Sequence, residues 1–124
     1  MDEPKARILL VDDEEMLLEI GSEMIEFLGY SVKTAQGGQE CLDILENDQN
    51  FDLVILDMAM PDLDGQQTLA EIQKRSLAKR VIISSGFNLD SDRDAILASE
   101  RVVGALNKPF NLSELSRIIN ETLQ

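Results

Sequence analysis

The chain has 124 residues, the length of one ordinary domain. Its 24 acidic and 11 basic residues give a net charge of −13, which argues against direct binding to nucleic acids or to anionic membranes. The absence of histidine excludes histidine-based nucleophile relays and zinc–histidine sites, and the single cysteine excludes an intrachain disulfide. No apolar run is long enough for a membrane span or a signal peptide. We therefore expect a cytoplasmic protein that forms one domain over residues 1–124.

Short apolar runs alternate along the chain with segments of helical periodicity. The first run, residues 8–11, ends at two aspartates, and apolar residues then recur at helical spacing as far as Gly29. Gly29 is expected to end that helix in a left-handed conformation. A strand of alternating character follows, then a helix with Cys41 on its apolar face. We interpret Cys41, together with Met16 and Met24 of the first helix, as core residues.

The second half of the chain repeats this alternation. An all-apolar run at 53–56 ends at Asp57, and Pro61 and Gly65 mark the turn after it. We expect the further elements to be a helix after Gly65, a strand at 81–83 that ends in serines, a weaker helix near 90–99, a strand at 102–106 and a helix opened by a capping box of Asn111 and Glu114.

Five strands that alternate with five helices predict a parallel sheet with helices on both faces. The first, third and fourth strands are wholly apolar, so they belong in the middle of the sheet, whereas the second and fifth fit its edges. The strand order 2-1-3-4-5 satisfies this placement. We therefore predict a fold of the α/β class, the flavodoxin-like (βα)5 three-layer sandwich, which has this strand order.

The polar residues that follow the strands should meet, because parallel strands all end at one edge of the sheet. That edge collects Asp12, Asp13, Asp57, the pair Ser84–Ser85, and Lys108. At about 4 Å and an effective dielectric constant of about 20, each pair of carboxylates repels by on the order of 4 kcal/mol. One lysine cannot neutralise three carboxylates, but Mg²⁺, which prefers oxygen ligands, can. A carboxylate beside such a cation can attack phosphorus and form an acyl phosphate.

Three other functions fit parts of this pattern. A phosphatase of the haloacid-dehalogenase type needs Asp-x-Asp directly after a strand, and Ala59 stands where its second aspartate belongs. A calcium-binding loop that starts at residue 60 would have Met60 as its first ligand. A flavin-binding flavodoxin needs a hydroxyl-rich phosphate loop where this chain has two aspartates. Binding of Mg²⁺ without flavin and without tight calcium binding separates these alternatives.

At these positions the sequence resembles the receiver domains of two-component response regulators, from Arg7 to Leu123. The resemblance rests on residues 8–14, on Asp57 followed by Pro61 and Gly65, on Ser85-Gly86 and on Lys108-Pro109-Phe110. The Ser-Ser-Gly-Phe stretch and the Lys-Pro-Phe-x-Leu-x-Glu-Leu ending are also similar to receiver domains attached to hybrid sensor kinases.

The resemblance implies a phosphoacceptor domain, not a classical enzyme, that phosphorylates itself with Mg²⁺ and loses the phosphate slowly. The implied roles are Asp57 as phosphoacceptor, Asp13, Asp57 and the backbone carbonyl of Ala59 as direct Mg²⁺ ligands, Asp12 as a ligand through water, Ser85 as switch hydroxyl, and Lys108, before a cis Pro109, as the partner of the phosphate. The donor would be a histidine kinase or a histidine phosphotransfer protein, since this chain has no histidine. A weak dimer is a further interaction that such domains allow.

Three positions depart from the family's common pattern. Ala59 offers no hydrogen bond to a hydrolytic water, and Phe87 can shield that water, so we expect a long-lived phosphorylated form. Ala105 stands where the family usually has an aromatic residue that changes rotamer. We therefore expect the response to phosphorylation to be confined to residues 85–92, with little change at 102–106.

Overall fold

The structure, a computed structural model, describes residues 6–58, 65–85, 102–107 and 110–123, without the side chains of Ser85 and Asn107. Its strands are β1 (Arg7–Val11), β2 (Ser31–Ala35), β3 (Leu53–Asp57), β4 (Val81–Ser85) and β5 (Val102–Asn107). Its helices are α1 (Glu15–Phe27), α2 (Gly38–Asn47), α3 (Gly65–Arg75) and α5 (Leu112–Leu123). The helix that the sequence predicts near 90–99 lies outside these residues.

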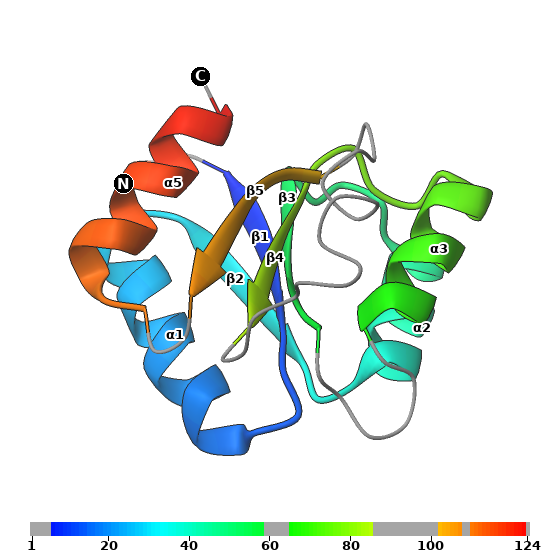
Figure 1. Cartoon of the computed structure of the whole chain (residues 1–124), viewed down its shortest axis with the longest axis horizontal. Coiled ribbons are helices and arrows are strands. Elements are labelled where there is room, and N and C mark those ends of the chain that lie inside the picture. Colours follow the sequence, from blue (N-terminus) through cyan, green and yellow to red (C-terminus); the bar gives the residue numbers. More distant parts are fainter. Residues whose placement is uncertain (1–5, 59–64, 86–101, 108–109, 124) are drawn as a thin grey trace.

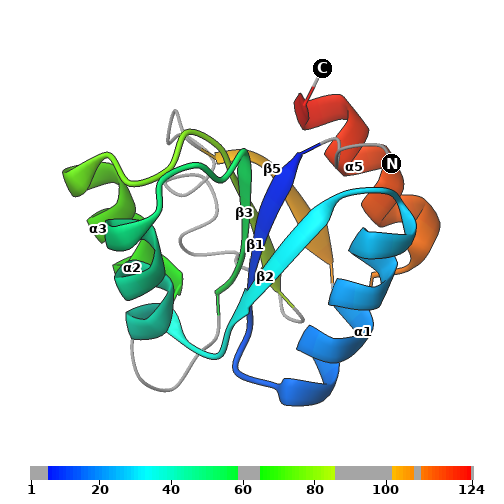
Figure 2. The same ribbon diagram turned by 180° about the vertical axis from the view of Figure 1, so that it is seen from behind.

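The strands form one parallel sheet in the order β2-β1-β3-β4-β5, which confirms the predicted topology. Helices α1 and α5 cover one face of the sheet, and α2 and α3 cover the other, so that three layers result (Figures 1 and 2). The chain therefore has the flavodoxin-like architecture, and the carboxyl ends of all strands lie at one edge.

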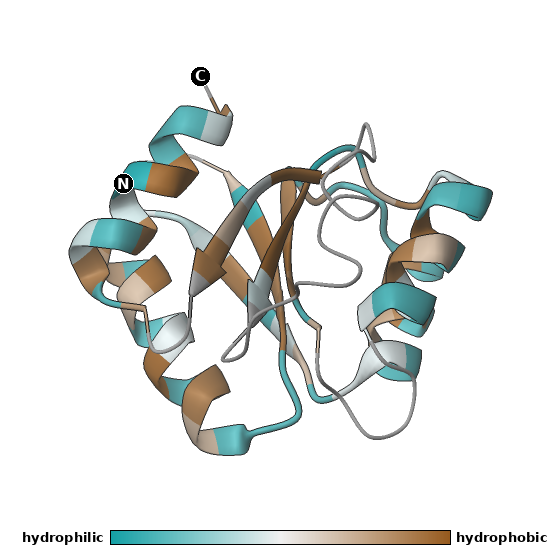
Figure 3. Cartoon of the chain, in the orientation of Figure 1, coloured by the Kyte–Doolittle hydropathy of each residue, from teal (hydrophilic) through white to brown (hydrophobic). Residues whose placement is uncertain are grey.

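Burial explains why the apolar strands are central. All five residues of β3 are buried, whereas β2, at the edge, is mostly half-exposed. Successive residues of the central strands alternate between two apolar clusters, one under α1 and α5 and the other under α2 and α3. Hydropathy colouring accordingly places most hydrophobic residues on the strands and on the inner sides of the helices (Figure 3). Because both faces are covered, both must be apolar.

Helix α1 differs from the prediction on one side. Met16 is 71% exposed, and Ile20 and Phe27 are 46% and 77% exposed, so Met16 is not a core residue as the sequence analysis expected. The buried residues of α1 are Leu18, Gly21 and Ile25, which define the face toward the sheet. The apolar residues of α1 span a wider arc than one packing partner can cover, and the part beyond that face remains in solvent.

The other local predictions in these segments are confirmed. Gly29 follows the end of α1 with φ of 97°, a conformation that glycine adopts without steric cost. Cys41 is fully buried on α2, and burial raises the pKa of its thiol to about 12, so the thiol is unreactive at neutral pH. Met24 packs against the core. The backbone N–H of Glu114 donates to Oδ1 of Asn111 at 2.8 Å, as an N-cap requires.

Candidate functional site

The pairing of β1 with β3 brings three carboxylates together. Val11 lies in register with Leu56, so the residues that follow them, Asp12 and Asp57, come out side by side at the carboxyl edge. One carboxylate oxygen from each of Asp12, Asp13 and Asp57 lies within 4.8 Å of the other two. The cluster that the sequence analysis predicted from strand order alone is therefore present.

The three carboxylates lie at different depths. Asp57 is 1% exposed and Asp12 is 5% exposed, whereas Asp13 is exposed to solvent. Asp57 thus forms the floor of the cluster and Asp13 its open side. Burying a carboxylate is costly unless a counter-charge or hydrogen bonds compensate for the lost hydration. A site with two buried carboxylates and one exposed carboxylate is therefore suited to a cation that arrives from the side of Asp13.

Two hydrogen bonds hold Asp12, the residue that follows β1. The backbone N–H of Asp12 donates to the carbonyl of Ala35 at 3.1 Å, which ties it to β2. Oδ1 of Asp12 accepts from the backbone N–H of Glu14 at 3.0 Å. This bond turns the chain from β1 toward α1 and orients the carboxylate at the same time.

The floor of the site is held from β4 and from α3. Asp57 lies in register with the buried Ser84, and the backbone N–H of Met58 donates to the carbonyl of Ser84 at 3.0 Å. The N–H of Gly65, the first residue of α3, donates to the carbonyl of Met58 at 3.3 Å. Met58, which follows the buried Asp57, is therefore hydrogen-bonded to β4 through its N–H and to α3 through its carbonyl.

Several predicted site residues fall outside the described part of the chain. Ser85 is the last residue of β4 and lies in register with Asn107 at this edge, but its hydroxyl is not described. Ala59, Phe87, Lys108 and the peptide bond before Pro109 also lie outside. Their roles remain predictions from the sequence.

The donor set determines what the cluster can hold. Within the described part of the chain it offers carboxylate oxygens and no nitrogen or sulfur ligand, and hard divalent cations such as Mg²⁺ prefer such oxygens. Two or three protein oxygens leave room for waters and a phosphoryl group in an octahedral shell. The residues present therefore fit Mg²⁺.

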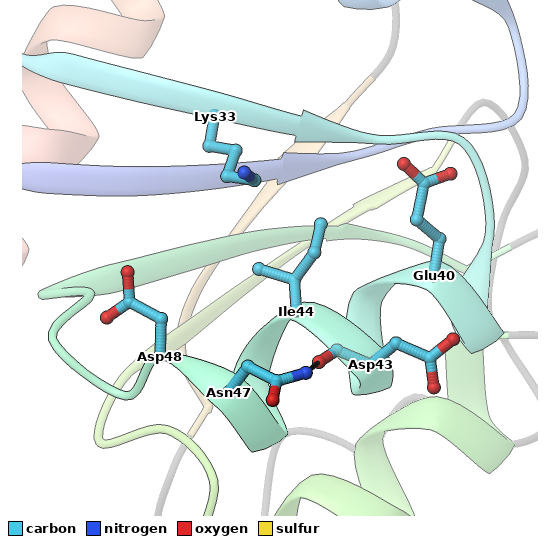
Figure 4. Close-up of a pocket in the computed structure, with 6 residues that line it drawn as sticks. All are labelled: Lys33, Glu40, Asp43, Ile44, Asn47 and Asp48. Carbon is cyan, nitrogen blue, oxygen red and sulfur yellow. Dashed lines mark hydrogen bonds between the residues drawn. The ribbon is translucent and has the colours of Figure 1, made fainter.

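The described residues also form a pocket of about 310 Å³ away from these carboxylates, between edge strand β2 and α2 (Figure 4). Lys33 lies on the strand side, Ile44 projects from the middle of α2, and Glu40, Asp43, Asn47 and Asp48 complete the lining. None of the predicted site residues lines this pocket.

Comparison with known proteins decides the family. The model of the response regulator receiver domain matches residues 8–120. The chain belongs to the response regulator receiver family. This receiver domain is 38% identical over its whole length to the transcriptional regulatory protein GlrR of Escherichia coli K12, and 33% identical over 96% of its length to the sensor kinase CckA of Brucella abortus. It spans 28% and 13% of those two relatives.

Solved structures agree with this assignment. A receiver domain protein from Clostridium thermocellum is 35% identical with a TM-score of 0.84, over 95% of this chain and 94% of that one. The response regulator TrrA of Thermotoga maritima, solved in complex with Mg²⁺ and BeF, is 34% identical with a TM-score of 0.80, over 95% and 99%. The chain is thus a phosphoacceptor module of two-component signalling, and the phosphatase, calcium-loop and flavodoxin alternatives receive no support. No helix among the described residues is both long and apolar enough to cross a membrane.

Two features of the site region were not predicted from the sequence. One is the exposed apolar side of α1, which begins next to Asp13. A signal for it is present, since Met16 and Ile20 are four positions apart and fall on a different stripe from Leu18 and Ile25. The other is the close approach of Gly65 to β3, which depends on how α3 lies against the sheet.

Proposed function

We propose that Asp57 is the phosphoacceptor of this receiver domain and that residues 1–124 act as one such domain in the cytoplasm. The three-carboxylate cluster with Asp57 at its floor carries the proposal, since it provides a nucleophilic oxygen next to a cation site. Asp13, Asp57 and the backbone carbonyl of Ala59 would bind Mg²⁺ directly and Asp12 through water. When bound, the cation neutralises charge on the phosphoryl oxygens.

The proposed chemistry is in-line phosphoryl transfer from a phosphohistidine. An oxygen of Asp57 forms the new P–O bond while the P–N bond of the donor breaks, and its electron pair returns to the imidazole nitrogen. Lys108 pairs with a phosphoryl oxygen, and the Ser85 hydroxyl donates to another. Hydrolysis requires water in line with the acyl phosphate, and Ala59 offers that water no hydrogen bond. Ala59→Asn or Ala59→Glu should therefore shorten the lifetime of the phosphorylated form.

The donor is a histidine kinase or a histidine phosphotransfer protein, and we propose that it docks on α1. Met16, Ile20 and Phe27 form an exposed apolar ridge that starts beside the open side of the site. Helix α1 also carries four glutamates and no basic residue. Charge complementarity therefore favours a donor surface with an apolar centre and basic flanks.

One experiment tests the acceptor and the docking surface together. With acetyl phosphate and Mg²⁺, the intact mass should rise by one phosphoryl group, and Asp57→Asn should abolish the rise, whereas Ser85→Ala should still accept the group. Chelation of Mg²⁺ should also abolish it. Met16→Ser should slow transfer from a phosphorylated kinase but leave labelling by acetyl phosphate unchanged, because the small donor needs no docking surface. Stable labelling of Asp57→Asn would disprove the acceptor assignment.

A further inference from the structure

Helix α3 approaches the end of β3 more closely than any side chain allows. A Cβ atom placed on Gly65 would lie 2.4 Å from the Cα of Met58, 2.6 Å from its Sδ and 2.7 Å from the backbone oxygen of Asp57. Carbon atoms without a bond between them pack at about 3.5–4.0 Å. The first residue of α3 must therefore be glycine for the helix to lie at this distance from Asp57.

This requirement comes from space and not from backbone conformation. Gly65 begins α3, and Gly29 is the one glycine with positive φ among the described residues. Helix propensity by itself favours alanine over glycine. A harmful effect of Gly65→Ala would therefore have to come from the contact with β3.

Of the three atoms that a Cβ on Gly65 would meet, only the Met58 Sδ can rotate away. Two of the three are backbone atoms of Asp57 and Met58, and this backbone is bound to Ser84 on β4 through the N–H of Met58. On the other side, Leu69 and Ile72 anchor α3 in the same apolar cluster as the Met58 side chain. An added methyl group must displace either the end of β3 or the start of α3.

The other two carboxylates would not follow such a displacement. Asp12 and Asp13 follow β1, and Asp12 is hydrogen-bonded to Ala35 and Glu14, neither of which belongs to α3. The register pairs between β1 and β3 end at Val11 and Leu56, one residue before Asp12 and Asp57. Movement of the Asp57–Met58 backbone would therefore change the distance between Asp57 and the other two aspartates even where these pairs are kept.

We infer that Gly65 is a positioning residue of the site: its missing side chain lets α3 press on the Asp57–Met58 backbone and sets Asp57 against Asp12 and Asp13. Gly65 acts through that backbone and contacts neither the metal nor the phosphoryl group. The inference rests on the proposed role of Asp57, and it adds a residue that bears no reactive group.

Gly104 provides a matched control. A Cβ atom there would lie 2.9 Å from Cδ1 of Ile118, so Gly104→Ala is also crowded, but its neighbours are side-chain atoms that can rotate. Both alanine variants are expected to lower the melting temperature. Only Gly65→Ala should weaken Mg²⁺ binding, by about 10-fold or more, as is typical when the support of a metal ligand is lost. The Mg²⁺ titration is followed through amide NMR signals of the folded protein. The measured affinity then does not depend on the fraction of protein that is unfolded.

A second variant locates the clash. Met58→Ala removes Sδ but leaves the Met58 Cα and the Asp57 oxygen in place, so it should not restore Mg²⁺ affinity to Gly65→Ala. If Gly65→Ala does not fold in plain buffer, all variants are measured in an osmolyte that favours the folded state. Wild-type affinity in Gly65→Ala, an equal loss in Gly104→Ala, or rescue by Met58→Ala would overturn the inference.

A measurement without metal separates this inference from the proposed function. Asp57→Asn should stabilise the metal-free wild-type protein by relieving repulsion, and this gain should be smaller in the Gly65→Ala background, because Asp57 is displaced there. An equal gain in both backgrounds would contradict the inference even if Mg²⁺ binds. Failure of the wild-type protein to bind Mg²⁺ would instead contradict the proposed function.

Discussion

Aspartates lie at both ends of strand β1, but their surroundings differ: at one end they pair with an arginine, and at the other they lie against one another. At its start, the Arg7 guanidinium forms an ion pair with Asp48 at 2.8 Å, and the Arg7 backbone N–H donates to Oδ2 of Asp52 at 2.8 Å. The guanidinium carbon of Arg7 also lies 4.4 Å from the centre of the Phe51 ring. At its end, Asp12 lies against the carboxylates of Asp13 and Asp57.

The difference between these two ends separates a carboxylate that supports the fold from the carboxylates that we propose bind Mg²⁺. The Arg7 guanidinium beside Asp48 holds the pKa of that carboxyl below its ordinary value of 3.8. Such an exposed pair contributes little and is screened by salt, but it favours the folded state. By Coulomb repulsion, the clustered carboxylates at the other end are expected to oppose folding in the absence of a cation. One strand thus has a stabilising charge arrangement at one end and, at the other, the carboxylate cluster that we propose binds Mg²⁺.

Removal of one charge from the cluster should produce the largest effect. Without metal, Asp57→Asn should raise the free energy of unfolding, by up to about 4 kcal/mol if the repulsion of one carboxylate pair is fully relieved. Asp13→Ala should give a smaller gain, because Asp13 is exposed and its charge is screened. Thermal melts in the presence of a chelator measure both, and the same variants should bind Mg²⁺ more weakly. Lower melting temperatures for both variants at neutral pH would show that the cluster does not repel.

Neutralising the aspartate that pairs with Arg7 at the start of β1 should change the melting temperature in the opposite direction. Asp48→Asn removes the ion pair with Arg7 and should lower the melting temperature slightly, with a smaller change in 1 M salt. Because folding lowers the pKa of Asp48, its contribution is present above the unfolded pKa and is lost as the pH falls through the folded pKa. The difference between wild type and Asp48→Asn should therefore be constant near neutral pH and should diminish as the pH falls below the ordinary Asp pKa of 3.8. A difference that grows on acidification would contradict this assignment.

The smallest expected effect concerns the response to a phosphate mimic. Amide exchange with and without beryllofluoride should change at 85–92 and little at 102–106, because Ala105 lacks the ring that would carry a rotamer change. The start of β1 around Arg7 should not respond and serves as the internal control. Strong protection changes across β5 and α5 would show that the usual switch operates without an aromatic residue.

The sequence alone predicted the strand order and the cluster of Asp12, Asp13 and Asp57. Fully apolar runs predicted β1, β3 and β4 as central strands, since only strands covered on both faces need two apolar faces. The aspartates at the ends of β1 and β3 were then expected to meet at one edge, because parallel strands end together. Only the tertiary structure decided which apolar residues are exposed, how deeply each aspartate is buried and how closely α3 approaches β3. Met16 and Phe27 are exposed although the apolar residues of α1 have helical spacing. Helical spacing shows that apolar residues share sides of a helix, but it does not show how much of the helix surface the rest of the protein covers. The tertiary structure also made Asp57 the buried carboxylate and Gly65 the contact that supports it, because depth and close approach depend on how α3 packs against the sheet.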